Sequence, residues 1–221
     1  MHHYIQATTE EDFTIKVCRK IVEEAKKSID SKGSFTFVLS GGRTPKKIFQ
    51  ELASTYKETI EWEKVHFFWL DERCVKPTDK QSNYKLAYDY LISHISEVGS
   101  IHRIEGELEP EVAREKYKKD LLNFFGQNDV CFDFILLGMG EDGHVASLFP
   151  NSRELNLSVD IVLSTQKVYN GYRRVTLGLN TINQSSYKLL MLKGKEKMNI
   201  IDKNLNLPIN KIKNKKIVYL I

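Results

Sequence analysis

The sequence has 221 residues, of which 41% are hydrophobic and 28% are charged, a balance typical of one globular domain with a substantial buried core. The three cysteines, Cys18, Cys74 and Cys131, lie far apart without a CxxC pair, so the sequence favours a reducing compartment over a disulfide framework or a cysteine zinc site. Because no stretch approaches the roughly 20 apolar residues that span a bilayer, and a net charge of +4 is small for a nucleic-acid binder, we expect a cytoplasmic protein that binds neither membrane nor nucleic acid.

Apolar segments alternate with amphipathic segments along the chain, which predicts an open α/β fold with a mostly parallel sheet. Several of the apolar segments have no polar alternation, as strands covered on both faces should. Strands are predicted at Phe35–Leu39, Val65–Leu70, Phe132–Leu137, Arg174–Leu179, Tyr187–Leu192 and Ile217–Ile221. Helices are predicted at Glu10–Asp30, Pro45–Tyr56, Asn83–His94, Pro110–Phe125 and Lys195–Lys203. We find no repeat or linker that would divide residues 1–221 into separate domains.

The first candidate site is the segment SGGRTP, residues 40–45, which joins an apolar strand to a helix. Gly41 and Gly42 allow an anion to approach the backbone closely, and unpaired N–H groups at a helix N-terminus favour negative charge. We expect Thr44 to cap the helix, with Pro45 at its first position. Ser40 would complete a phosphate-binding turn, although an ordinary strand-to-helix turn has the same composition.

A charged triplet follows the strand VHFFWL, and in open α/β sheets ligands bind beyond the carboxyl ends of strands. Asp71 and Arg73 are therefore candidates to face a substrate, and QSNY at residues 81–84 opens the next helix. A solvated turn is the simpler interpretation of the same residues.

The segment LGMGEDGHVASLFP, residues 137–150, is the most informative. It contains the GxGxxG spacing of dinucleotide-binding proteins, but Glu141 and Asp142 would place carboxylates against a pyrophosphate, and Pro150 ends any helix early. His144 can exchange protons near neutral pH, and Asp142 lies two residues away, so the pair fits an acid/base site. A metal site would need further ligands that this segment lacks. We therefore expect neither a cofactor nor a metal.

Two basic segments late in the chain could complete an anion site. Arg174 enters the strand VTLGL, and Lys197 belongs to KGKEK after the strand YKLLML. Arginine and lysine both bind phosphate, although taken alone these two residues read as surface charges.

In this order and spacing, SGGRTP, WLDERCV with QSNY, LGMGEDGHVASLFP, RRVTLGL and KGKEK resemble the family that joins 6-phosphogluconolactonases with glucosamine-6-phosphate isomerases. The resemblance runs over nearly the whole chain, and its specific element is GxGxDGHxASLFP. It implies a three-layer Rossmann-like fold that binds a 6-phosphosugar without a cofactor. By position, it implies substrate binding by Ser40, Gly41, Gly42, Thr44, Asp71, Arg73, Arg174 and Lys197, and acid/base chemistry by Asp142 and His144.

The resemblance also separates the two branches of the family. The deaminase branch carries a glutamate five residues beyond the histidine, and Phe149 occupies that position here. The sequence therefore favours hydrolysis of 6-phospho-D-glucono-1,5-lactone, a step of the oxidative pentose phosphate pathway, by a water that His144 activates. A glucosamine-6-phosphate isomerase or deaminase and a non-catalytic phosphosugar-binding module remain the alternatives.

Overall fold

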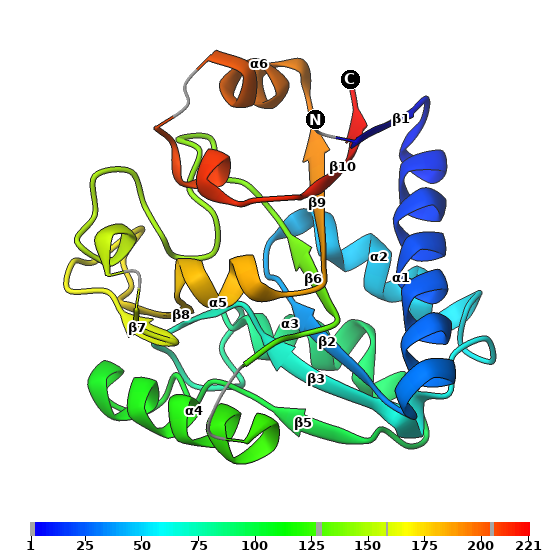
Figure 1. The fold of residues 1–221 in the computed structure, drawn as a ribbon, viewed down its shortest axis with the longest axis horizontal. Coiled ribbons are helices and arrows are strands. Elements are labelled where there is room, and N and C mark those ends of the chain that lie inside the picture. The colour runs from blue at the N-terminus through cyan, green and yellow to red at the C-terminus, as the bar shows by residue number, and fades with distance from the viewer. Residues whose placement is uncertain (1–2, 127–129, 158, 204–205) are drawn as a thin grey trace.

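The computed structural model describes residues 3–126, 130–157, 159–203 and 206–221 (Figure 1). Its centre is a seven-stranded sheet in the order β1-β10-β9-β6-β2-β3-β5, in which every neighbouring pair of strands is parallel. These strands span His3–Ala7 (β1), Phe35–Leu39 (β2), Val65–Trp69 (β3), Ser100–His102 (β5), Phe134–Leu137 (β6), Tyr187–Lys193 (β9) and Lys216–Leu220 (β10). The predicted α/β class and mostly parallel sheet are confirmed.

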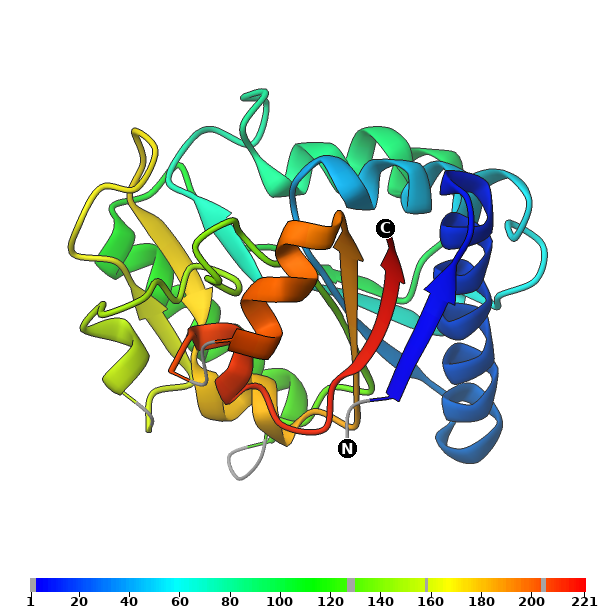
Figure 2. The same cartoon turned by 90° about the horizontal axis from the view of Figure 1, so that it is seen from above.

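Helices cover both faces of this sheet, as Figure 2 shows. On one side α1, α2 and α3 pack next to one another, and on the other side α4 packs Phe124 and Phe125 against Phe68 of β3. The helices span Glu10–Lys32 (α1), Arg43–Ser54 (α2), Asn83–Tyr90 (α3), Pro110–Phe125 (α4), Leu179–Gln184 (α5) and Lys195–Lys203 (α6). None of the helices in the described ranges is both long and apolar enough to cross a membrane.

A second, three-stranded antiparallel sheet is attached at the carboxyl end of β3. It has the order β4-β8-β7, with β4 at Asp71–Arg73, β8 at Arg174–Leu177 and β7 at Val162–Ser164. Leu70 joins the two sheets, because its N–H donates to the Leu39 carbonyl and its carbonyl accepts from Leu177 N–H, each at 2.9 Å. The strands after Leu70 therefore carry the chain over the carboxyl edge of the main sheet.

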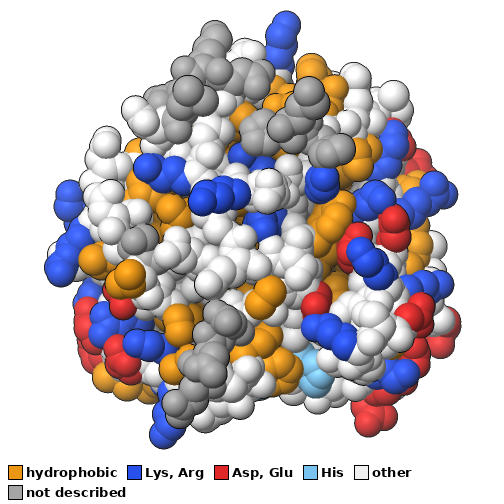
Figure 3. Space-filling model, in the orientation of Figure 1, with side chains coloured by type: hydrophobic (Ala, Val, Ile, Leu, Met, Phe, Trp, Pro, Cys, Tyr) orange, Lys and Arg blue, Asp and Glu red, His pale blue; other side chains and the backbone are white. Residues whose placement is uncertain are grey.

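The face of the molecule seen in Figure 3 carries charge unevenly. In Figure 3 several Lys and Arg side chains gather above the middle of the face, whereas acidic and basic side chains mix along the rim.

Apolar side chains are largely internal, and the core includes fully buried Phe37, Phe67 and Trp69 on neighbouring strands. This packing fixes the strand ends from which the site is built.

Candidate active site

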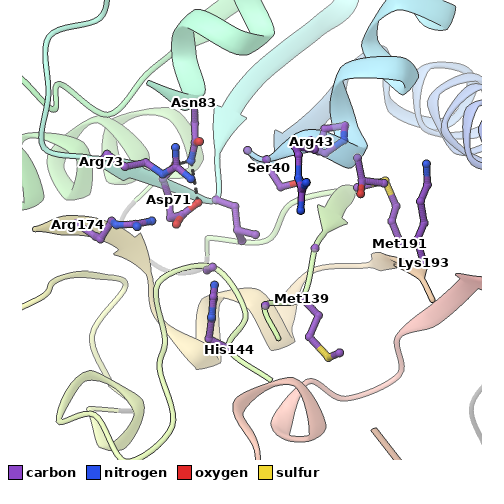
Figure 4. A pocket seen from close by; sticks show the side chains of 18 of the residues that line it. Ser40, Arg43, Asp71, Arg73, Asn83, Met139, His144, Arg174, Met191 and Lys193 are labelled. Carbon is purple, nitrogen blue, oxygen red and sulfur yellow. Dashed lines mark hydrogen bonds between the residues drawn. The ribbon is translucent and has the colours of Figure 1, made fainter. Parts of the chain in front are cut away.

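A cleft of about 220 Å³ opens where β2, β3, β6 and β9 end. Its lining includes every residue that the sequence analysis assigned to substrate binding, together with His144 (Figure 4). These residues are Ser40, Gly41, Gly42, Thr44, Asp71, Arg73, His144, Arg174 and Lys197. Side chains separated by more than 150 positions in the sequence thus face one cavity. The structure therefore brings these residues together at the ends of the strands.

The SGG turn forms one wall of the cleft. Gly42 has a φ of +100°, a backbone conformation that suits glycine, and it is the residue that precedes α2. The prediction that Thr44 caps this helix is wrong, because α2 begins at Arg43, Gly42 occupies the cap position and no side chain caps the helix. Pro45 is consequently the third helical residue, where it still lacks only an N–H that the helix could not use.

Ser40 directly follows β2, the strand from which this turn begins. Its side chain is buried, and within the described ranges its Oγ has no hydrogen-bond partner. Buried polar atoms are nearly always paired in folded proteins. An unpaired hydroxyl in the lining of the cleft is therefore suited to bind a polar ligand.

Asn83 links the turn to β4, and it was not predicted from the sequence as a site residue. Its Nδ2 donates to the Asp71 carbonyl at 2.8 Å and to Asp71 Oδ1 at 3.0 Å. A Cβ at Gly41 would lie 1.7 Å from Asn83 Oδ1, so only glycine allows this approach. The position of Asn83 directly after Ser82, the cap of α3, was the signal available in the motif QSNY.

Glu72 holds the start of α3 in place. Its carboxylate accepts hydrogen bonds from the backbone N–H groups of Arg73, Asn83 and Tyr84, at 2.7–2.8 Å, and from Ser82 Oγ at 2.9 Å. Burial raises the pKa of Glu72 to about 7, while the four donated hydrogen bonds favour the charged form. Glu72 does not line the cleft. Its carboxylate instead stabilises the start of α3, which carries Asn83 into the lining.

Asp71 and two arginines lie together on the small sheet. Asp71 is buried, and its Oδ2 accepts from Ser147 Oγ at 2.5 Å. Arg73 Nη1 donates to the Gln81 carbonyl, and Arg174 Nη2 donates to the Tyr169 carbonyl. Among the described residues, the Nε atoms of both arginines are buried without a partner. Two guanidinium groups in one wall, each with an unused donor, suit an anionic or carbonyl oxygen.

Burial lowers the pKa of Arg174, and the nearby Asp71 carboxylate opposes part of that effect. Its neighbour Arg173 turns the other way, as successive residues of a strand do, and forms an ion pair with Glu111. Of these two neighbouring arginines, Arg174 therefore lines the cleft and Arg173 does not.

His144 faces the SGG turn across the cleft. Its Nδ1 lies 2.6 Å from Asp142 Oδ1, which also accepts the His144 backbone N–H at 3.1 Å. The imidazole covers Gly140, where a Cβ would lie 2.1 Å from the ring. A carboxylate bound to Nδ1 selects the tautomer that carries its proton on Nδ1 and leaves Nε2 as the atom that can exchange a proton. Asp142 itself lies outside the cleft lining.

The cationic end of the cleft is formed by Lys197, Arg43 and Lys193. Lys197 donates to the Met139 carbonyl at 2.8 Å, and burial lowers its pKa. Arg43 and Lys193 were not identified from the sequence, although each belongs to a motif that was quoted, SGGRTP and KGKEK. Their spacing gave no reason to prefer them to their neighbours.

Comparison with known proteins identifies the family of this chain. The sequence profile of the family described as glucosamine-6-phosphate isomerases/6-phosphogluconolactonase matches residues 8–219. The chain belongs to this family. A 6-phosphogluconolactonase of Treponema pallidum is 38% identical over 167 residues, covering 74% of this chain and 69% of the relative. That of Haemophilus influenzae is 37% identical over 186 residues, covering 80% and 79% of the two chains.

The fold agrees over the full chain. The crystal structure of 6-phosphogluconolactonase from Thermotoga maritima superposes with a TM-score of 0.88 at 31% sequence identity, covering 100% of this chain and 99% of that chain. The three-layer Rossmann-like fold that the resemblance implied is thereby confirmed.

Within this family, the surroundings of Phe149 distinguish the site. Its side chain is buried, its ring centroid lies 4.6 Å from that of His144, and it stacks on Tyr169 with centroids 3.6 Å apart and planes 5° from parallel. An apolar ring therefore occupies the position at which the resemblance expects a glutamate in the deaminase branch. In the part of the chain that the structure describes, no three His, Cys, Asp or Glu side chains are grouped closely enough to hold a metal ion.

Proposed function

We propose that this protein hydrolyses 6-phospho-D-glucono-1,5-lactone to 6-phosphogluconate. The observation that carries the proposal is the hydrogen bond from His144 Nδ1 to Asp142, which orients an imidazole toward a cleft lined by the SGG turn, two arginines and a lysine. Relatives with 34–38% identity carry the name 6-phosphogluconolactonase, which supports the same reaction.

Substrate anchoring is the first task of the site. The N–H groups at the start of α2, the Ser40 hydroxyl and the cationic end of the cleft provide donors for the phosphate. Holding the phosphate at one end fixes where the lactone carbonyl lies, and such positioning can contribute a large part of a rate enhancement. No cofactor is required for hydrolysis of a lactone.

Proton transfer is the second task. With Nδ1 bonded to Asp142, the Nε2 atom of His144 accepts a proton from water, and the resulting hydroxide attacks the C1 carbonyl. The same proton then passes to the ring oxygen as the C1–O bond breaks, so the imidazole ends the cycle neutral. The unused Nε–H groups of Arg73 and Arg174 are the donors we assign to the negative oxygen of the tetrahedral intermediate.

Replacement of the base tests the proposal. In His144→Ala, kcat for freshly prepared lactone should fall by roughly 10²–10⁴-fold, the usual contribution of a general base. Hydrolysis is followed by acid release and corrected for the spontaneous reaction. His94→Ala is the matched control, because His94 is an exposed histidine whose ring bonds the Asp89 carbonyl and does not line the cleft.

Three outcomes would contradict the proposal. Near-normal turnover by His144→Ala would remove the assigned base. Release of ammonia from glucosamine 6-phosphate by the wild-type protein would favour the deaminase branch, in which Asp71 would act as a carbon base. Binding of 6-phosphogluconate without hydrolysis above the spontaneous rate would indicate a non-catalytic phosphosugar-binding protein.

A further inference from the structure

The His144 imidazole is held by packing as well as by its hydrogen bond. Gly140 lies under one side of the ring, and the Phe149 ring lies 4.6 Å away, tilted by 40°. The hydrogen bond to Asp142 alone leaves the ring free to tilt about the Nδ1 contact. The neighbouring Phe149 ring restricts that motion, so the orientation of Nε2 depends on how firmly Phe149 is held.

Phe149 is in turn held by a residue from a distant segment. The Tyr169 ring lies flat against it, with centroids 3.6 Å apart and an interplanar angle of 5°. Aromatic pairs of this kind contribute beyond their buried area. The Tyr169 hydroxyl has no hydrogen-bond partner among the described residues. The ring, and not the hydroxyl, therefore makes the contact with Phe149.

The backbone gives Tyr169 a fixed position. Tyr169 and Tyr172 exchange hydrogen bonds of 2.9 and 3.2 Å across a two-residue turn, in which Asn170 and Gly171 have φ angles of +51° and +85°. Positive φ at both central residues, with the sequence Asn-Gly, is the pattern of a type I′ hairpin turn. The ring of Tyr169 is therefore presented from a rigid turn between β7 and β8.

The same residue contacts the anion-binding side of the cleft. Its carbonyl accepts a hydrogen bond from Arg174 Nη2 at 3.2 Å. Arg174 is buried, and the other two wall residues of the small sheet, Asp71 and Arg73, lie on the strand paired with it. Tyr169 thus contacts the base through Phe149 and the substrate-binding arginine through its backbone.

We propose that Tyr169 is a positioning residue that aligns the His144 imidazole through the Phe149 ring while its carbonyl orients Arg174. The inference rests on the proposed function, because it assigns a consequence for turnover to the orientation of His144. The two contacts can be separated by substitution, since the side chain acts on His144 and the backbone acts on Arg174. Removal of the side chain should therefore lower kcat and leave KM nearly unchanged.

The test compares three variants. Tyr169→Ala removes the stack, and we expect kcat to fall by roughly 10-fold or more, because small misplacements of a catalytic group are costly. Tyr169→Phe keeps the ring and should restore wild-type kcat. Tyr172→Ala removes the other tyrosine of the same turn, whose ring stacks on no aromatic ring in the described part of the chain, and should leave kcat unchanged. Circular dichroism at the assay temperature confirms that each variant is folded, and Tyr169→Leu replaces Tyr169→Ala if the latter is not.

A second measurement does not depend on turnover. The imidazole C–H resonances of His144, assigned by their loss in His144→Ala, should shift in Tyr169→Ala but not in Tyr169→Phe or Tyr172→Ala, because the adjacent Phe149 ring moves. If wild-type protein fails to hydrolyse the lactone while these resonances shift as expected, the proposed function is wrong and the positioning contact stands. Unchanged kcat and unchanged His144 resonances in Tyr169→Ala would overturn the inference, as would an equal loss of kcat in Tyr172→Ala.

Discussion

Gly140→Ala should inactivate the site without unfolding the protein. A Cβ at position 140 would lie 2.1 Å from Cε1 and Nδ1 of His144, whereas ordinary contacts lie at 3.4–4 Å. The ring must therefore move by more than 1 Å, and this movement breaks the 2.6 Å contact between Nδ1 and Asp142. Displacement of a catalytic group by about 1 Å can cost about 10²-fold in rate, and we expect kcat to fall by this factor.

The free energy of unfolding should respond differently. The φ of Gly140 is not positive, so alanine fits the backbone, and such substitutions change stability by about 1 kcal/mol or less. The displaced atoms belong to the His144 imidazole, and this side chain is 26% exposed, so the ring can move toward solvent. Chemical denaturation should therefore give a midpoint close to that of the wild type while activity is largely lost.

A double-mutant cycle decides whether Gly140 acts through His144. If it does, Gly140→Ala combined with His144→Ala should be no slower than His144→Ala alone, because the base is already absent. Each variant is assayed with fresh lactone against the spontaneous rate. A wild-type kcat in Gly140→Ala, or additive losses in the double variant, would refute the reasoning.

Two further predictions follow from contacts outside the acid/base pair. Gly41→Ala should raise KM, because the added Cβ would displace Asn83 and break the hydrogen bonds from Asn83 to Asp71. Steady-state kinetics with varied lactone concentration give kcat and KM, and an unchanged KM would contradict the prediction. Burial, followed by the charges of His102 and Lys32, lowers the pKa of His66 in the folded protein below its ordinary value of 6.5. The unfolded chain then binds more protons, so the free energy of unfolding should decrease as the pH falls below about 6.5, and urea titrations should show a smaller decrease in His66→Gln. Parallel pH curves for the two proteins would show that His66 does not contribute.

Local sequence was sufficient to predict the bounds of some elements. Pro110–Phe125 and Lys195–Lys203 have the predicted bounds, and β2 at Phe35–Leu39 is also as predicted. Other elements differ by a few residues: the predicted helix Asn83–His94 ends at Tyr90 and continues as a separate turn of 3-10 helix at Ile92–His94. Periodicity over many residues gives a strong signal, whereas the ends of elements depend on caps and neighbours.

Short elements were not predicted because their pairing is not local. β4 consists of the charged triplet Asp71–Arg73, and it is a strand because β8, about 100 positions later, pairs with it. β1, β5, β7 and α5 were missed for the same reason, since these short segments contain no apolar run of the kind that marks β2. Tertiary pairing overrides weak local preferences in such segments.

The sequence by itself was sufficient to predict candidate residues for the chemistry, because glycines, carboxylates and an imidazole at the ends of apolar strands can be recognised from neighbours in the chain. Only the tertiary structure decided that Ser40, Arg174 and His144 face one cleft. The parallel strands β2 and β6 end at the same edge of the main sheet, which brings Ser40 and the loop of His144 together, and the antiparallel pairing of β8 with β4 adds Arg174. It also decided that Asn83 lies on Gly41 and that Tyr169 supports Phe149, because each contact joins side chains whose own segments give no sign of the partner.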